Sequence, residues 1–142
     1  MPQKVIASQD LPSRFILLGE DDADDQEMLK EVFASIDVSF VLFFVNNGSE
    51  MLSALKKLRD DEMPCLIVLD YNMPGLNAAD ILRELSTNER CKNIPKVVWS
   101  TSGSEKFRSL CLELGAIDYV IKPNNAEELE KLARYMLSLS LV

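Results

Sequence analysis

The stretch "FILLGEDDADDQ", residues 15–26, places five acidic residues directly behind a short apolar run. A continuous apolar run of this length is typical of a parallel strand that is buried on both faces. The acidic residues therefore stand where such a strand ends. Ligands of open α/β sheets bind beyond the carboxyl ends of the strands. The stretch thus predicts both a fold class and the place of a functional site.

Four more apolar runs follow, and segments with helical periodicity separate them. The runs are "FVLFFV" (40–45), "CLIVLD" (65–70), "KVVWS" (96–100) and "YVI" (119–121). Five strand–helix units in a row predict a doubly wound α/β fold, in which helices cover both faces of a parallel five-stranded sheet.

Several residues predict where the helices begin and end. A weak amphipathic pattern over about 78–85 predicts the third helix. Gly115 predicts the end of the fourth, because glycine readily adopts the left-handed conformation that ends helices. Asn125 and Glu128 have the spacing of a capping box and predict the start of the last helix.

Composition limits the class of protein. The 142 residues suffice for one domain with a substantial core, and the balance of 47% hydrophobic and 27% charged residues is typical of a soluble protein. A net charge of −8 argues against nucleic-acid binding. No apolar run approaches the roughly 20 residues that span a bilayer. We expect a cytoplasmic protein with a flexible arm over 1–12 and one domain over 13–142.

Polar residues gather at the predicted strand ends. They are Glu20, Asp21 and Asp22 after the first strand, Asp70 closing the third, Ser100 closing the fourth and Lys122 after the fifth. Carboxylates at one rim repel each other unless a cation joins them. Mg²⁺ is commonly held by one or two carboxylates together with water and phosphate oxygens. The strand ends therefore predict a metal site.

Four segments resemble one known family. "ILLGEDD" (16–22), "LIVLDYNMPG" (66–75), "VVWST" (97–101) and "YVIKP" (119–123) are similar to the receiver domain of two-component response regulators. The resemblance covers about residues 13–140. It implies a flavodoxin-like fold with strand order 2-1-3-4-5. The connection "STNERCKNIP" further resembles small single-domain regulators associated with phytochrome-type kinases.

The resemblance implies a role for each acidic site residue. Asp70 would accept a phosphoryl group from the phosphohistidine of a sensor histidine kinase or phosphotransfer protein. The chain has no histidine and cannot be that donor. Asp21 would bind Mg²⁺ directly, and Glu20 would act mainly through water. Asn72 would offer its backbone carbonyl to the metal.

The remaining site residues would act on the bound phosphoryl group. Ser100 matches the hydroxyl residue that binds it, and Lys122 matches the fixed positive charge. Tyr119 matches the switch aromatic, whose ring we expect to turn inward when Ser100 moves. The resemblance implies no organic cofactor, and no enzymatic activity beyond Mg²⁺-dependent self-phosphorylation and self-dephosphorylation at Asp70.

Other functions compete with this interpretation. An Asp-nucleophile phosphatase of the haloacid dehalogenase type needs a second acidic residue at the position that Asn72 occupies. A flavodoxin-like mononucleotide carrier needs an anion-binding loop after the first strand, where acidic residues would repel phosphate. A degenerate receiver could serve as a docking surface without phosphorylation. The intact Asp21, Asp70, Ser100 and Lys122 argue against the last alternative.

Departures from the family pattern bear on the geometry of the site. Gly19 stands where an apolar residue is usual and is expected to loosen the strand. Ala78, preceded by Asn77, stands where glycine is usual.

Asp24 and Asp25 are expected to be solvated residues of a helix start. The apolar end "RYMLSLSLV" (134–142) favours a homodimer through the last helix, with folding back onto the chain's own core as the alternative.

Overall fold

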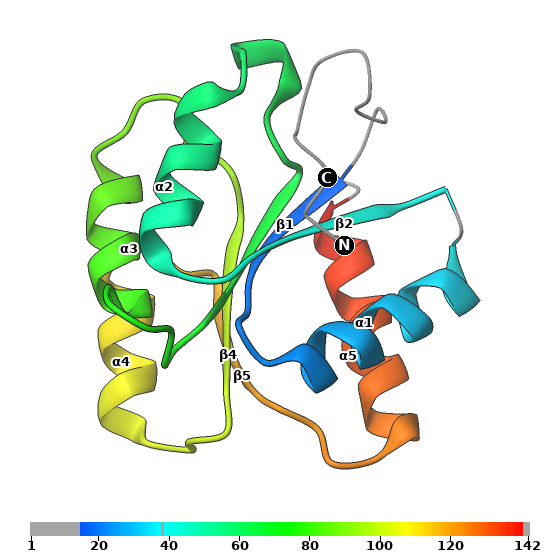
Figure 1. Ribbon diagram of the computed structural model, residues 1–142. Helices are drawn as coiled ribbons and strands as arrows, with labels where there is room; N and C mark the ends of the chain where they lie inside the picture. The colour runs from blue at the N-terminus through cyan, green and yellow to red at the C-terminus, as the bar shows by residue number, and fades with distance from the viewer. Residues whose placement is uncertain (1–14, 38, 141–142) are drawn as a thin grey trace.

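The predicted fold class is confirmed by a computed structural model, which describes residues 15–37 and 39–140. Five parallel strands form one sheet in the order β2-β1-β3-β4-β5, flanked by helices (Figure 1). The elements are β1 (Phe15–Gly19), α1 (Ala23–Ile36), β2 (Val41–Val45), α2 (Gly48–Lys57), the 3₁₀ helix η2 (Asp60–Glu62), β3 (Leu66–Asp70), α3 (Ala78–Ser86), β4 (Lys96–Ser100), α4 (Glu105–Glu113), β5 (Asp118–Ile121) and α5 (Ala126–Ser140). Within this part of the chain, no helix has the length and apolarity to cross a membrane. The predicted arm over 1–12 lies outside the described residues.

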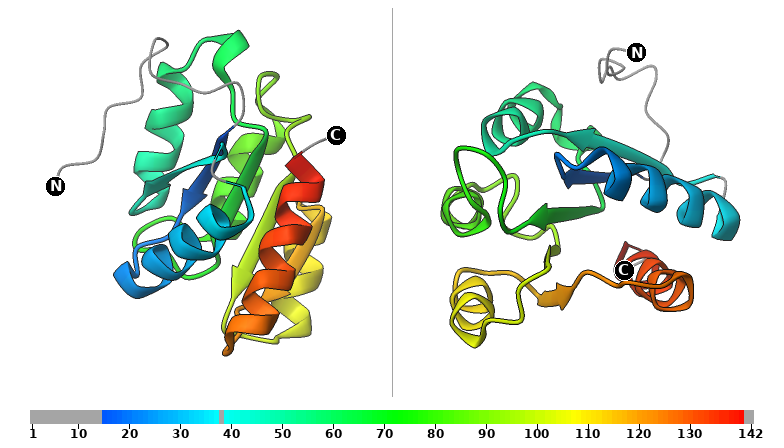
Figure 2. Two further views of the ribbon diagram at one scale, coloured as in Figure 1. Left: turned by 90° about the vertical axis from the view of Figure 1, so that its right-hand side faces the viewer. Right: turned by 60° about the horizontal axis from the view of Figure 1, so that its bottom comes forward.

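The apolar runs become strands because both faces of the sheet are covered. Helices α2, α3 and α4 lie on one face, and α1 and α5 lie on the other (Figures 1 and 2). Successive side chains of a strand point to opposite faces. Leu17 and Leu69 accordingly join the first core, and Leu18 and Val68 join the second. The three central strands are buried throughout, whereas the edge strands β2 and β5 are partly exposed.

The predicted end of α4 and the predicted start of α5 are confirmed. Gly115 follows α4 with a φ of +112°, in the left-handed region that glycine tolerates. The Asn125 side chain accepts a hydrogen bond from the Glu128 amide at 2.8 Å, at the start of α5. The departure at Ala78 is accommodated by burial of its side chain at the start of α3, directly behind the capping residue Asn77.

The expectation that Gly19 loosens β1 is wrong. A Cβ at this position would lie 2.6 Å from the Met73 sulfur and 3.3 Å from the Met51 terminal methyl group. Both methionines are buried. Gly19 therefore lets side chains from the loop after β3 and from α2 approach the strand backbone closely.

Candidate functional site

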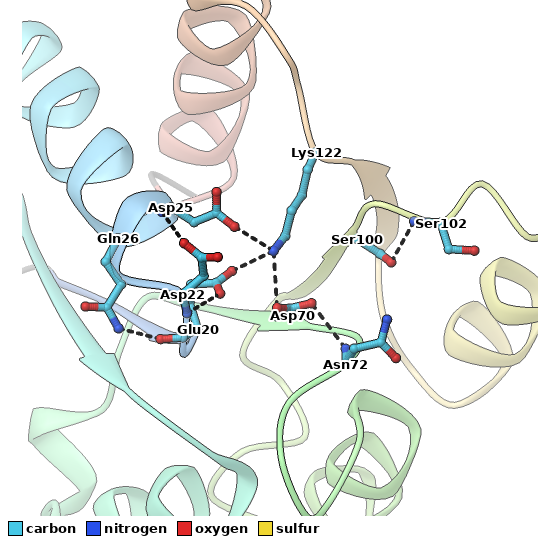
Figure 3. A network of polar contacts seen from close by, with 9 residues as sticks. All are labelled: Glu20, Asp22, Asp25, Gln26, Asp70, Asn72, Ser100, Ser102 and Lys122. Atoms are coloured by element: carbon cyan, nitrogen blue, oxygen red, sulfur yellow. Dashed lines mark hydrogen bonds and ion pairs between the residues drawn. The ribbon is translucent and has the colours of Figure 1, made fainter.

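The site lies at the carboxyl ends of β1, β3 and β5 (Figure 3). Strand pairing aligns Gly19 with Leu69, so Glu20 and Asp70 follow neighbouring positions at the same edge of the sheet. Both residues are buried, with exposed fractions of 0% and 7%. Buried carboxylates need partners, because water no longer stabilises their charge.

Lys122 supplies that partner. Its Nζ lies 2.9 Å from Glu20 Oε1, 2.8 Å from Asp25 Oδ2 and 3.2 Å from Asp70 Oδ2. The three N–H donors of the ammonium group thus have one carboxylate each. Burial opposes the charge, but the hydrogen bonds to Asp25 and Glu20 outweigh it and raise the pKa of Lys122. The side chain is therefore a fixed cation at neutral pH.

Glu20 is held by both carboxylate oxygens. Oε1 contacts Lys122, and Oε2 accepts a hydrogen bond from the Asp22 amide at 2.9 Å. Burial raises the pKa of Glu20 to about 7, and the charge of Asp70 adds to this. The hydrogen bonds from Asp22 and Lys122 act in the opposite direction. The charge of Glu20 thus responds to any further cation that enters the site.

The acidic residues fit a hard divalent cation. Glu20, Asp21 and Asp70 each offer a carboxylate oxygen, and these oxygens lie within 4.8 Å of one another. Asp21 is exposed, so the cluster is open to solvent on one side. The Asn72 amide donates to Asp70 Oδ1 at 3.1 Å and so fixes Asn72 beside the carboxylate. Oxygen donors of this kind match the preference of Mg²⁺.

Asp25 belongs to the site, although its sequence position predicted a solvated helix start. Asp22 caps α1 by accepting from the Asp25 amide at 3.0 Å. The first turn of α1 then carries the Asp25 carboxylate to Lys122. One signal in the sequence could have placed Asp25 at the site. Asp25 follows Asp21 by four residues, which is about one helical turn. The sequence did not show that Lys122 would lie against this turn.

Ser100 and Tyr119 meet through the loop after β4. Ser100 is fully buried, and its Oγ accepts a hydrogen bond from the Ser102 amide at 3.0 Å. The Tyr119 hydroxyl donates to the Ser102 carbonyl at 2.8 Å. The Tyr119 side chain is already buried, at 3% exposure. The ring therefore already lies inward in this structure, and its movement on phosphorylation stays a prediction.

Comparisons with known proteins agree with the fold and the site described above. Residues 16–134 match the response regulator receiver domain family. The chain is 30% identical over 126 residues to response regulator Rcp1 of Synechocystis sp., across 87% of this chain and 86% of Rcp1. It is 36% identical over 123 residues to transcriptional regulatory protein CpxR of Klebsiella pneumoniae, across 86% of this chain. That match covers 48% of CpxR, so the chain spans about half of the longer protein.

Solved structures of response regulators are similar to this chain in fold. The phosphorylated cyanobacterial phytochrome response regulator RcpA has a TM-score of 0.81 at 27% identity, covering 90% of this chain and 94% of RcpA. The Mn²⁺-bound form of Rcp1 has a TM-score of 0.77 at 30% identity, covering 88% and 92%. The chain belongs to the response regulator receiver domain family of two-component signalling.

Proposed function

We propose that this receiver takes a phosphoryl group on Asp70 and passes the signal through a protein-binding surface. The observation that carries the proposal is the setting of Asp70. Its carboxylate ends a central strand, contacts the Lys122 ammonium at 3.2 Å and lies beside Glu20 and Asp21. A carboxylate nucleophile next to a fixed cation and metal-binding acids suits phosphoryl transfer. The phosphorylated state of RcpA supports the same chemistry here.

The donor is a phosphohistidine of a sensor histidine kinase or a phosphotransfer protein. An Asp70 oxygen bonds to phosphorus as the P–N bond breaks, and the imidazole nitrogen leaves with the bonding electrons. Lys122 compensates the charge on the transferred oxygens through a charge-assisted hydrogen bond. Later attack of water on phosphorus releases inorganic phosphate and restores the Asp70 carboxylate. The domain over 13–142 would carry out both steps.

The cation for this site would be Mg²⁺, held by Glu20, Asp21, Asp70 and the Asn72 carbonyl. Once bound, it would offset the repulsion between the carboxylate nucleophile and the incoming phosphoryl oxygens. The Mn²⁺-bound form of Rcp1 supports a divalent cation in this family. The oxygen donors of this chain, with an exposed carboxylate at Asp21, support Mg²⁺ with several waters retained.

Labelling with acetyl phosphate tests the proposal. With Mg²⁺ present, intact mass should show one added phosphoryl group on wild type and none on Asp70→Asn. Asp61→Asn is the matched control, because the Asp61 side chain is 71% exposed and pairs only with Arg59 among the ion pairs of the described residues. Labelling of Asp70→Asn would refute the assignment. Rapid hydrolysis of a small phosphate ester by wild type would favour a phosphatase instead.

The output would begin at Ser100. To bind a phosphoryl oxygen, the Ser100 hydroxyl would move relative to the Ser102 amide, from which it accepts a hydrogen bond. The Ser102 carbonyl accepts a hydrogen bond from the Tyr119 hydroxyl, so movement of this loop would reach β5. Beryllofluoride with Mg²⁺ should therefore change the emission of Trp99, which adjoins Ser100. Ser100→Ala should weaken the change, and an equal response at equal occupancy of Asp70 would contradict this coupling.

The surface that carries the signal would be that of α4, β5 and α5. Exposed apolar side chains lie on these elements and the loop between them, at Leu112, Ile117, Ile121 and Tyr135. A second copy of the chain is one partner that such a surface fits. The apolar side chains of Leu132, Ala133, Met136 and Leu137 are buried in the chain's own core, so the dimer would use the outer face of α5. Sedimentation of wild type against Ile121→Glu tests this, and monomers in both would exclude the dimer.

A further inference from the structure

The ring of Trp99 lies against the ammonium group of Lys122. Lys122 Nζ is 4.8 Å from the ring centroid, within the range of a cation–π interaction. We infer that Trp99 is a positioning residue, which holds Lys122 in place while the partners of its ammonium group change. This role rests on the proposed phosphoryl transfer at Asp70.

The sheet places Trp99 beside the nucleophile. Pairing of β3 with β4 aligns Val68 with Val97 and Asp70 with Trp99. Val68, Val97 and Trp99 belong to the same core, on the face that α1 and α5 cover. The indole is 1% exposed, so surrounding side chains fix its plane. Trp99 can therefore serve as a rigid support next to Asp70.

Trp99 differs from the other buried rings of this core in carrying an indole nitrogen. Nε1 is buried and has no hydrogen-bond partner among the described residues. A buried N–H without a partner destabilises the folded state, and a phenylalanine would avoid that cost. Among the aromatic rings, indole attracts a cation most strongly through its face. The contact of the ring face with Lys122 is an interaction that Trp99 makes in addition to its packing.

The cation–π contact has a property that the three ion pairs lack. Glu20, Asp25 and Asp70 each occupy one N–H donor of Lys122, so a phosphoryl oxygen must displace at least one of them. The attraction of the ring face is electrostatic and uses no donor. It persists while the hydrogen bonds exchange. The ring thus keeps the ammonium group at the rim through the transfer.

Two variants separate the ring face from simple filling of space. Trp99→Phe keeps an aromatic face, and Trp99→Leu keeps only apolar volume. Phe33→Leu is the matched control, because Phe33 is a buried ring of the same core and is not among the contacts of Lys122. Urea unfolding of all three establishes that they are folded and ranks their stabilities.

The direct measurement is the NMR signal of the Lys122 side chain in lysine-labelled protein without metal. It is assigned by its absence in Lys122→Arg. A proton near the face of an indole is shifted upfield, so the Lys122 Hε signals should be upfield in wild type. They should return to ordinary values in Trp99→Leu and stay partly shifted in Trp99→Phe. Ordinary values in wild type would overturn the inference.

The functional measurement is the rate of labelling by acetyl phosphate at saturating Mg²⁺. Trp99→Leu should slow labelling by about tenfold, Trp99→Phe should recover most of the rate, and Phe33→Leu should match wild type. Equal rates in Trp99→Leu and Trp99→Phe would also overturn the inference. If wild type itself is not labelled, the proposed function fails. The lysine shift then decides alone whether Trp99 positions Lys122.

Discussion

Replacing Lys122 with methionine removes the ammonium group that joins Glu20, Asp25 and Asp70, while keeping most of the apolar stem. At an effective dielectric constant near 20, each contact of about 3 Å contributes on the order of 5 kcal/mol of attraction before desolvation is counted. Loss of one partner from a buried ion pair costs about 3–5 kcal/mol.

Two features of the site reduce that cost. The side chains of Lys122 and Asp25 are 12% and 21% exposed, so water reaches part of the cluster. Glu20, whose pKa is raised to about 7, can take up a proton when the ammonium group is absent. We therefore expect Lys122→Met to lower the free energy of unfolding by about 2–4 kcal/mol at pH 7 without metal.

Urea unfolding followed by circular dichroism, at low salt with a chelator, measures this loss. Lys131→Met is the control, since Lys131 is 65% exposed and its pairs with Glu127 and Glu128 are worth at most about 1 kcal/mol. Mg²⁺ should stabilise Lys122→Met more than wild type, because the ion no longer competes with the ammonium group. At 100 times its Kd, a ligand adds about 2.7 kcal/mol. Equal losses in both variants, or equal stabilisation by Mg²⁺, would refute the electrostatic account.

Three further outcomes are expected. Asp21→Asn should weaken Mg²⁺ binding in a titration, whereas Asp24→Asn, with the same change of charge, should not; equal effects would exclude Asp21 as a ligand. Burial raises the pKa of Glu20 from 4.5 to about 7, so its stabilising contribution is full below pH 4.5 and lost as pH rises through about 7. Between pH 5 and 8, metal-free wild type should lose stability relative to Glu20→Gln, by at most roughly 1.4 kcal/mol per pH unit; a constant difference would contradict this. Gly48→Ala should lower the free energy of unfolding in urea by about 1–3 kcal/mol, because the new Cβ would lie 2.8 Å from Leu76 Cβ and 3.1 Å from the Leu76 carbonyl oxygen. Unchanged stability would show that the segment around Leu76 moves to make room for the new Cβ.

Much of the site followed from the sequence because a parallel sheet brings its strand ends together. Once the apolar runs predicted five parallel strands, Glu20, Asp70, Ser100 and Lys122 had to lie at one edge. This prediction needed only the end of each strand and no detail of packing. The strand over Lys96–Ser100 was predicted to the residue. Each of the other four strands differs from its predicted apolar run by one residue at one end, since ladder pairing rather than hydrophobicity sets where a strand ends.

The tertiary structure decided which side chains touch. Asp25 and Lys122 are 97 residues apart, and their contact depends on how α1 leaves the rim. The space at Gly19 is filled by Met73 from another loop. The inward ring of Tyr119 and the place of Trp99 beneath Lys122 likewise depend on neighbours from other elements. Local sequence patterns specify periodicity and capping, whereas contacts across the sheet arise only when distant elements assemble in one register.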